Sequence, residues 1–312
     1  MKAVVTGVAG FIGSHLVESL LADGHEVLGI DCFVDHYPRV IKERNLARAH
    51  DHRTFRFVEG RLQDQDLPDL LEGAEQVFHL AAQAGVRASW GRDFSLYTDH
   101  NVLATQRLLE AAVAAGKPRV IYASSSSVYG DTPTLPLRED SACRPVSPYG
   151  VTKLAAEHLG RLYHLSHALP VVSLRYFTVY GPRQRPDMAF HRFLAAARGR
   201  TPIHLYGDGE QTRDFTYVED IVAATRAAAV SGRPGNAYNV GGGERVSLNQ
   251  VLRTIEGITG CRLETLREEP QKGDMRDTFA DTTAARRDLG FRSSVALADG
   301  LAREWDWLRS AR

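Results

Sequence analysis

The sequence has little or none of several features that define other classes of protein. It has three cysteines in 312 residues, Cys32, Cys143 and Cys261. They are far apart and form neither a CxxC pair nor a metal-ligand pattern, so we expect reduced thiols in a cytoplasmic protein. No apolar run approaches the ~20 residues that a membrane span needs. Residues Met1 to Thr6 lead directly into a glycine-rich turn and lack the parts of a signal peptide.

Charge of one sign is not in excess either. Lysine plus arginine and aspartate plus glutamate number 38 each, so the bulk charge favours neither nucleic acid nor a membrane as a partner. The histidines show no clustering that would hold a metal ion, and we expect no metal. Lysine is scarce because arginine supplies nearly all of the positive charge. A lysine in a chemically suggestive position is therefore informative here.

Lys153 is such a lysine, because it follows Tyr149 by four residues and on a helix this spacing places both side chains on one face. A tyrosine with its ordinary pKa of about 10 is a poor base at neutral pH. An ammonium about 5 Å away, at an effective dielectric constant near 20, favours the phenolate by about 3 kcal/mol, or roughly two pK units. The pair is therefore predicted to carry acid–base catalysis, although isolated pairs of this kind are also common on solvated helix surfaces.

Short β-branched runs alternate with helical patterns, which is typical of βαβ units and a parallel sheet. The predicted strands are Ala3–Thr6, Glu26–Ile30, Phe55–Val58, Gln76–Leu80, Arg119–Ala123 and Val171–Leu174. The predicted helices are Ile12–Ala22, Asn101–Ala115, Pro148–His167, Phe190–Arg198, Val218–Ala229 and Leu248–Ile258. The proline-containing segments Thr132–Pro148 and Gly181–Asp187 are predicted loops, the first of them over the active face.

After about residue 176 the strand–helix rhythm loosens. We therefore predict an α/β protein with a Rossmann-like, doubly wound parallel sheet and a smaller, partly interleaved C-terminal lobe. Residues 1–176, with a returning segment at about 214–240, would form the nucleotide-binding domain, and residues 177–312 the substrate-binding lobe. The site is expected in the cleft between the two.

A glycine-rich run follows the first predicted strand and opens the first predicted helix. Its residues Gly7, Gly10, Phe11, Ile12 and Gly13 are candidates for cofactor binding, because glycines let the backbone approach a pyrophosphate and the helix N-terminus attracts its charge. By itself the run could also be an ordinary strand–helix turn. Asp31 strengthens the prediction, since it ends the second strand about 20 residues later, where a carboxylate bonds both ribose hydroxyls and repels a 2′-phosphate. This favours NAD over NADP.

These residues, together with several later motifs, resemble the extended short-chain dehydrogenase/reductase family, and within it the nucleotide-sugar epimerases. The later motifs are His79–Ala82, Ser124–Gly130, Arg175–Gly181, Gly207–Gly209 and Arg213–Phe215, so the resemblance covers nearly the whole chain. It implies that further cofactor contacts come from Leu62, Leu80, Ala81, Ala82, Asn101, Ser124 and Tyr176. At Arg61 the family usually has an aspartate that contacts adenine, and we assign this arginine no such role.

The resemblance also narrows the reaction. Ser125 stands where the family places its catalytic serine or threonine, so the catalytic set is Ser125, Tyr149 and Lys153. Sugar 4,6-dehydratases carry Asp-Glu at the next two positions, and decarboxylases of UDP-glucuronate carry Glu at the second. Here Ser126 and Ser127 occupy both positions. What remains is removal of a hydride, rotation of the 4-keto sugar and return of the hydride, which is a 4-epimerisation.

Two stretches, Gly85–Trp90 and Phe177–His191, resemble UDP-glucuronate 4-epimerases in particular. Donors for a sugar carboxylate would come from Ser126, Ser127, Thr178 and Arg185, with Arg87 as a further candidate. The resemblance assigns the remaining substrate contacts to Met188, His191, Arg213 and Arg276. Family members often dimerise through two helices from each subunit, here about Asn101–Ala115 and Pro148–His167, so a homodimer is expected.

Three alternatives to a UDP-glucuronate 4-epimerase stay open at this point. The chain could be an epimerase of UDP-glucose or UDP-N-acetylhexosamine, in whose UDP-galactose-converting relatives the position of Thr178 is usually Asn. It could be a UDP-glucuronate decarboxylase, since the 4-keto form of an acidic sugar tends to lose carbon dioxide. From a different class, it could be a non-catalytic NAD-binding sensor.

Overall fold

The computed structural model describes residues 1–269 and 271–310. Its centre is a seven-stranded, wholly parallel sheet with the strand order β11-β6-β5-β4-β1-β2-β3. The strands are β1 Lys2–Thr6, β2 Glu26–Asp31, β3 Phe55–Glu59, β4 Gln76–His79, β5 Arg119–Ser125, β6 Val171–Tyr176 and β11 Ala237–Val240. The order reverses between β1 and β4, which is the Rossmann-like, doubly wound arrangement that the sequence predicts.

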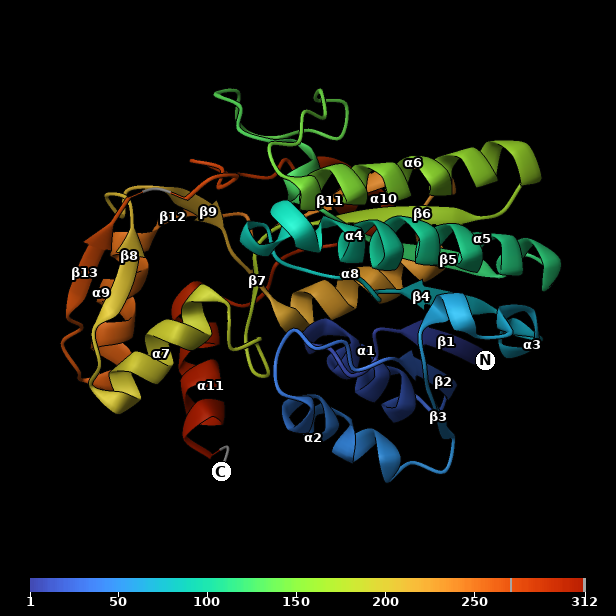
Figure 1. Ribbon diagram of the computed structural model, residues 1–312, viewed down its shortest axis with the longest axis horizontal. Helices are drawn as coiled ribbons and strands as arrows, with labels where there is room; N and C mark the ends of the chain where they lie inside the picture. The colour runs from blue at the N-terminus through green and yellow to red at the C-terminus, as the bar shows by residue number, and fades with distance from the viewer. Residues whose placement is uncertain (270, 311–312) are drawn as a thin grey trace.

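Helices cover both faces of this sheet (Figure 1). On one face α1 (Phe11–Ala22) packs against α2 (Arg39–His50) and α8 (Val218–Ser231), and on the other α5 (Ala104–Ala114) packs against α3 (Leu67–Leu71) and α6 (Pro148–His167). Alternate residues of each strand serve the two layers. Ala3 and Val5 belong to the core beneath α1, whereas Val4 belongs to the core beneath α5.

The start of α6 is fixed by local sequence. Pro148 occupies the first helical turn, and the side chain of Ser147 caps the helix by accepting a hydrogen bond of 3.1 Å from the backbone N–H of Gly150. A proline at this position is preorganised for a helix, and a serine cap satisfies a free N–H group. Tyr149 therefore lies in the first turn of α6, next to the end of the sheet, and Lys153 lies one turn further along.

The second lobe lies to the left in Figure 1 and surrounds a parallel pair of strands, β8 (Ile203–Tyr206) and β13 (Thr265–Glu268). Its helices are α7 Ala189–Gly199, α9 Leu248–Thr259 and α11 Leu297–Ser310. Short pairs join it to the sheet domain: β7 Val179–Tyr180 with β10 Thr216–Tyr217, and β9 Thr212–Asp214 with β12 Arg245–Ser247. The remaining elements are α4 Phe94–Tyr97, α10 Thr283–Leu289, η1 Leu62–Asp64, η2 Arg87–Ser89, η3 Gly91–Asp93, η4 Thr98–Leu103 and η5 Ser126–Val128.

The structure adds elements that the periodicity did not reveal. The predicted helix Asn101–Ala115 begins as a π-helical stretch, η4, before it continues as α5. Helix α2 was not predicted because it is rich in charged residues, and it buries even Lys42 and Asn45 on its inner face. The seventh strand, β11, falls within the segment expected to return to the sheet domain. The exact domain boundaries stay a prediction.

Candidate active site

A groove runs along the carboxyl ends of the parallel strands, with about 1180 Å³ of empty space including its open mouth. This is where ligands bind in open α/β sheets. Most of the predicted cofactor and catalytic residues line it: Gly7, Gly10, Phe11, Ile12, Gly13, Asp31, Leu62, Leu80, Ala81, Ala82, Ser124, Tyr149, Lys153 and Tyr176, joined by Arg185. The fold thus brings together residues from almost the whole sheet domain, while their roles in binding stay predictions.

The glycine turn has no room for side chains. Gly7 has a φ of +71°, and a Cβ atom there would lie 2.7 Å from the backbone nitrogen of Ala81. A Cβ on Gly13 would lie 2.2 Å from the carbonyl oxygen of Gly7. Such positions require glycine. The turn therefore presents bare backbone and the N-terminus of α1 to the groove, as a bound pyrophosphate needs.

Asp31 lies at the end of β2, at the edge of the same turn. Its carboxylate accepts hydrogen bonds from the backbone N–H groups of Ala9 (3.0 Å) and Phe33 (2.8 Å). Burial raises the pKa of this carboxyl, and the two N–H donors oppose that shift. The carboxyl group is held rigidly and faces the groove, in the position expected for a ribose contact.

The catalytic candidates meet at the end of β5. Nζ of Lys153 donates a hydrogen bond of 2.8 Å to the carbonyl oxygen of Ala123 and lies 5.1 Å from the ring centre of Tyr122. Burial alone lowers the pKa of Lys153 to about 7. Burial also raises the pKa of Tyr149, while a hydrogen bond from Ser125 and the charge of Arg185 lower it.

These shifts correct one sequence-based prediction. Lys153 was expected to be the cation that lowers the pKa of Tyr149, but it is not among the groups that do so, and burial lowers its own pKa. The groups that lower the pKa of Tyr149 are Ser125 and Arg185. The reason is that the spacing gives the distance between the two side chains but not the burial of Lys153, which is 4% exposed. Charged forms of buried groups are disfavoured until an opposite charge is close by.

The serine turn after β5 is internally hydrogen-bonded. Oγ of Ser125 accepts a hydrogen bond of 3.1 Å from the backbone N–H of Ser127 and lies 3.2 Å from the hydroxyl of Ser127. Ser126 is buried. The hydroxyl of Ser124 donates to Oε2 of Glu157 at 2.7 Å, so its donor is engaged with the protein although the residue lines the groove.

Arg185 enters the groove from the predicted loop 181–187. Its Nε and Nη2 donate to the two carboxylate oxygens of Asp187 at 2.9 and 2.8 Å. Nε2 of His36 lies 3.4 Å from the same carboxylate. His36 and Arg185 together hold the pKa of Asp187 well below its usual range, against the opposing effect of burial. The guanidinium is thus positioned by an acidic neighbour and still reaches the pocket that contains Tyr149.

Two contacts pin this loop to α1. A ring nitrogen of His15 lies 2.8 Å from the carbonyl oxygen of Pro182. Arg183, whose φ is +67°, forms an ion pair of 2.6 Å with Glu18. The loop is therefore anchored on α1, which covers one face of the central sheet.

Several predicted substrate residues lie outside the groove lining. Arg87 is 43% exposed, forms an ion pair of 2.7 Å with Asp274 and stacks 4.2 Å from the ring centre of Tyr206. Nη1 of Arg213 donates to the carbonyl oxygen of Arg276 at 2.9 Å, and Arg276, 61% exposed, pairs with Asp208. None of these arginines is among the residues that line the groove of Tyr149.

The other predicted residues have more structural surroundings. The side-chain amide of Asn101, 1% exposed, accepts a hydrogen bond from the backbone N–H of Gln83 and donates to its carbonyl oxygen and to the hydroxyl of Thr152. It therefore lies behind the residues that line the groove. His191 packs against Trp307 with ring centres 6.0 Å apart. Thr178 and Met188 are half-buried in the segment that carries Arg185.

Sequence reasoning missed part of the lining, namely His36, Tyr37 and Lys42 from the loop after β2 and the start of α2, and Gln83 after β4. Lys42 donates to the carbonyl oxygen of Val34 and lies 4.6 Å from the ring centre of Tyr37. Their position in the sequence could have indicated them, because they follow the carboxyl ends of β2 and β4, where Asp31 and Leu80 were already assigned to cofactor binding. Arg61, to which the sequence analysis assigns no adenine contact, forms ion pairs with Asp99 and Asp64.

Two general findings complete the description of the site. Within residues 1–269 and 271–310, no group of three or more His, Cys, Asp or Glu side chains is arranged to hold a metal ion. In the same part of the chain, none of the helices has the length and apolar character required to traverse a bilayer.

The parallel sheet, the glycine turn and the set Ser125, Tyr149 and Lys153 define a short-chain dehydrogenase/reductase of the extended type. The chain belongs to the NAD dependent epimerase/dehydratase family, whose model matches residues 3–241. This confirms the family resemblance found in the sequence.

Individual relatives are similar over almost their full length. The chain is 45% identical to the uncharacterized UDP-glucose epimerase YtcB of Bacillus subtilis, covering 99% of this chain and 98% of the relative. It is 37% identical to the UDP-glucuronate 4-epimerase of Thermodesulfobacterium geofontis, covering 97% and 95%. Among solved structures, the UDP-glucuronic acid 4-epimerase of Bacillus cereus in complex with UDP-glucuronic acid and NAD is 42% identical, with a TM-score of 0.97 and 100% of both chains covered.

Proposed function

We propose that this protein interconverts UDP-glucuronate and UDP-galacturonate by epimerisation at carbon 4, with hydride stored transiently on bound NAD. The observation that carries the proposal is that Tyr149 and Arg185 line one groove, and that both Ser125 and the charge of Arg185 lower the pKa of Tyr149. The similarity to UDP-glucuronate 4-epimerases over the full chain supports it.

The groove suits a dinucleotide with an unphosphorylated adenosine ribose. The bare glycine turn at Gly7, Gly10 and Gly13 would hold the pyrophosphate, and the carboxylate of Asp31 would hold the ribose hydroxyls. Leu62, Leu80, Ala81 and Ala82 offer apolar contacts along the groove. When bound, NAD supplies the acceptor and donor for the hydride.

Tyr149 would act as the general base and acid at the 4-hydroxyl. Because burial raises the pKa of its phenol, the base form depends on the hydrogen bond from Ser125 and on nearby positive charge. Lys153, with a pKa lowered to about 7, holds its ammonium or amine beneath the groove by donating to Ala123 and remains free to bond a ribose hydroxyl. Ser125 would hold the 4-oxygen and relay its proton.

The acidic sugar is favoured by what surrounds this centre. Ser126 and Ser127 place hydroxyls where related dehydratases and decarboxylases carry carboxylates, and Thr178 and Arg185 add further donors. A carboxylate held by several charge-assisted hydrogen bonds is prevented from rotating its bond to carbon 5 into line with the 4-keto group. That restraint would suppress loss of carbon dioxide and leave epimerisation as the outcome.

A second candidate is epimerisation of a neutral UDP-hexose. It is favoured by the fact that Arg185 is already paired with Asp187, which weakens its attraction for a sugar carboxylate. The name of the relative from Bacillus subtilis, a UDP-glucose epimerase, points the same way.

The experiment that separates these functions is product analysis after incubation with either UDP-glucuronate or UDP-glucose and no added cofactor. The proposal predicts UDP-galacturonate from the acid, at a kcat/KM at least tenfold above that for the neutral sugar. Preference for UDP-glucose would transfer the assignment to the second candidate, release of carbon dioxide with a UDP-pentose would indicate a decarboxylase, and no turnover of either would favour a binding protein.

We further infer a homodimer in the cytoplasm. The outer faces of η4 and α6 expose large apolar side chains: Leu103, Val151, Leu162 and Leu165. Such a patch fits a packing of two helices from each subunit. The three free cysteines fit a reducing compartment. We also assign cofactor binding to residues 1–176 with the returning segment at about 214–240, and sugar binding to the remainder of 177–312.

A further inference from the structure

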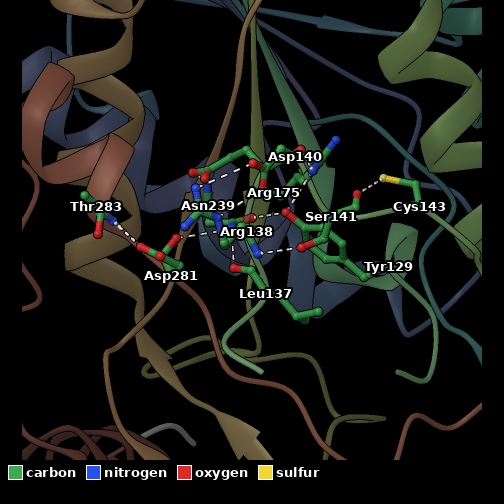
Figure 2. A network of polar contacts seen from close by, with 11 residues as sticks. Tyr129, Leu137, Arg138, Asp140, Ser141, Cys143, Arg175, Asn239, Asp281 and Thr283 are labelled. Carbon is green, nitrogen blue, oxygen red and sulfur yellow. Dashed lines mark hydrogen bonds and ion pairs between the residues drawn. The ribbon is translucent and has the colours of Figure 1, made fainter. Parts of the chain in front are cut away.

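A buried polar network lies beside the catalytic serine turn. We call it the Arg175 network and define it as Ser124, Tyr129, Glu157, Arg175 and Asn239; Figure 2 shows its members Tyr129, Arg175 and Asn239. All five side chains are buried, and they come from β5, the end of η5, α6, β6 and β11. Polar groups removed from water in this way are costly unless each finds a partner.

The centre of the network is an ion pair between Arg175 and Glu157. Nε of Arg175 lies 3.2 and 3.1 Å from the two carboxylate oxygens, and Nη2 lies 2.5 Å from Oε1. The hydroxyl of Ser124 donates to Oε2 of the same carboxylate at 2.7 Å. A buried fork of this kind has a defined geometry, and removing one partner leaves an uncompensated charge.

The other end of the network reaches the edge strand. Nη1 of Arg175 donates to the hydroxyl of Tyr129 at 2.8 Å, and this hydroxyl donates to Oδ1 of Asn239 at 2.6 Å. The amide of Asn239 donates in turn to the carbonyl oxygens of Leu137 (2.9 Å) and Asp281 (3.2 Å). Figure 2 shows this end converging on the side chain of Arg175.

Four of the five members lie next to the serine turn or to a residue that lines the groove. Ser124 precedes Ser125, and Tyr129 immediately follows the turn Ser126–Val128. Glu157 lies one turn beyond Lys153 on α6, and Arg175 precedes Tyr176, which lines the groove. The network therefore contacts the serine turn through Ser124 before it and Tyr129 after it. Through Glu157 it links the turn to α6, the helix that carries Tyr149 and Lys153.

We propose that Glu157 and Arg175, acting through Ser124 and Tyr129, are positioning residues that hold the turn of Ser125 in register with Tyr149. Glu157, Arg175 and Tyr129 do not line the groove. Their effect comes from geometry, because displacement of a catalytic group by about 1 Å can cost about a hundredfold in rate. The inference goes beyond the choice of sugar, since it concerns the proton transfer that any 4-epimerisation on this chain requires.

The first test is Tyr129→Phe, which keeps the buried ring and removes only the hydroxyl that links Arg175 to Asn239. We expect kcat to fall by about tenfold, a fraction of the loss that a 1 Å displacement causes, while KM for the UDP-sugar stays near the wild-type value. The matched control is Tyr238→Phe on β11, the edge strand that also carries Asn239. Its hydroxyl also has two partners, the N–H of Arg233 and the carboxylate of Asp288, but it lies outside the network and should leave kcat unchanged.

A second variant, Ser124→Ala, removes the donor to Glu157 with little change of volume, and Ser173→Ala, a buried serine on β6 outside the groove lining, is its control. If Tyr129→Phe does not fold, Ser124→Ala alone decides.

The decisive readout is whether the loss of kcat depends on Ser125, which is measured by combining each variant with Ser125→Ala. If the network acts through Ser125, adding Ser124→Ala or Tyr129→Phe to Ser125→Ala should lower kcat less than twofold further, because interacting sites are not additive.

The results have opposite meanings. Lower kcat at constant KM, with the loss absent in the Ser125→Ala background, supports the positioning role whichever sugar is used. A purely structural role would lower the melting temperature and leave kcat as in the wild type, or multiply its loss onto that of Ser125→Ala, and either result overturns the proposal. All of these rates are measured on the sugar that the protein turns over, so failure of the UDP-glucuronate assignment is distinguishable from failure of this one.

Discussion

The end of the groove that we propose for the nucleotide, the nucleotide end, is built differently from the end that we propose for the sugar, the sugar end. The nucleotide end is mainly backbone: a turn where a side chain on Gly7 or Gly13 would collide with main-chain atoms, and a carboxylate held by two N–H groups. The side chains that we assign to the sugar end, such as Ser127, Thr178 and Arg185, come from distant segments, and the cation of Arg185 is already paired with Asp187. On this assignment the first ligand is recognised by shape and the second by a balance of charges.

The largest expected effect is at the point where the two ends meet. Tyr149→Phe removes the acid–base group and should lower kcat at least ~100-fold. Binding of NAD and of the UDP-sugar, measured by calorimetry, should remain, because the ring still fills its place. A rate within a few-fold of the wild type would mean that another group transfers the proton.

The backbone character of the nucleotide end can be broken with one methyl group. Gly13→Ala would place a Cβ atom 2.2 Å from the oxygen of Gly7, so the turn must shift. We expect the amount of NAD retained on purification to fall by about tenfold or more, since close approach of the backbone to the pyrophosphate is lost. Gly24→Ala is not a suitable control because of its positive φ, whereas Gly257→Ala, in open space on α9, should retain the cofactor fully.

The charge balance of the sugar end is tested by Arg185→Gln. We expect kcat/KM for UDP-glucuronate to fall about tenfold, the value of one charged hydrogen bond, with a smaller loss for UDP-glucose. The charge of Arg185 lowers the pKa of Tyr149, so its removal raises that pKa. The limb of the kcat profile that rises as Tyr149 deprotonates should then move to higher pH.

Arg185→Lys keeps the charge and should return this limb toward its wild-type position. A limb that does not move in Arg185→Gln would show that the charge of Arg185 is screened from the phenol in the working enzyme.

A smaller effect is expected in the fate of the intermediate. Thr178→Ala or Ser127→Ala removes one donor to the sugar carboxylate, worth about 1–3 kcal/mol with a charged acceptor. The ratio of UDP-pentose to epimer, measured by chromatography, should rise several-fold. Thr254→Ala, on the outer face of α9, serves as the control. An unchanged ratio would remove these hydroxyls from carboxylate binding.

The smallest effect concerns the support of the sugar end rather than its chemistry. Glu304 on α11 accepts the N–H of Gly181 at 2.9 Å, and burial raises its pKa to about 8. A carboxyl whose pKa is raised on folding stabilises the protein while it is protonated. Stability is therefore lost as the pH rises from the unfolded value near 4.5 through about 8.

Glu304→Gln should weaken this loss, so that the melting temperature falls less between pH 5 and pH 9 than in the wild type. Roughly 2–4 °C is expected for each kcal/mol of difference. Glu219→Gln, an exposed carboxylate on α8, makes the same change of charge and should leave the slope unaltered. An equal dependence of the melting temperature on pH in the wild type and both variants would mean that Glu304 does not titrate between pH 5 and pH 9.

The same contrast explains how much could be predicted from the sequence. The sheet, the glycine turn and the partners Asp31, Tyr149 and Lys153 follow from local patterns, because strand ends and helix spacing determine where such residues lie. The contact between His36 and Asp187, the partner of Arg185, could not be predicted, since it depends on how loops far apart in the chain meet. The lowering of the pKa of Lys153 could not be predicted for a related reason, because burial is a property of the assembled fold.

The central claim is that a single hydride leaves and returns at carbon 4 while Tyr149 moves the proton. The most direct measurement uses UDP-glucuronate carrying deuterium at carbon 4, incubated with the purified protein in ordinary water without added cofactor. The account predicts UDP-galacturonate that retains the deuterium at carbon 4, because the hydride is held within the site between the two steps. Product that has lost the label to solvent, or a product epimeric at another carbon, would contradict it.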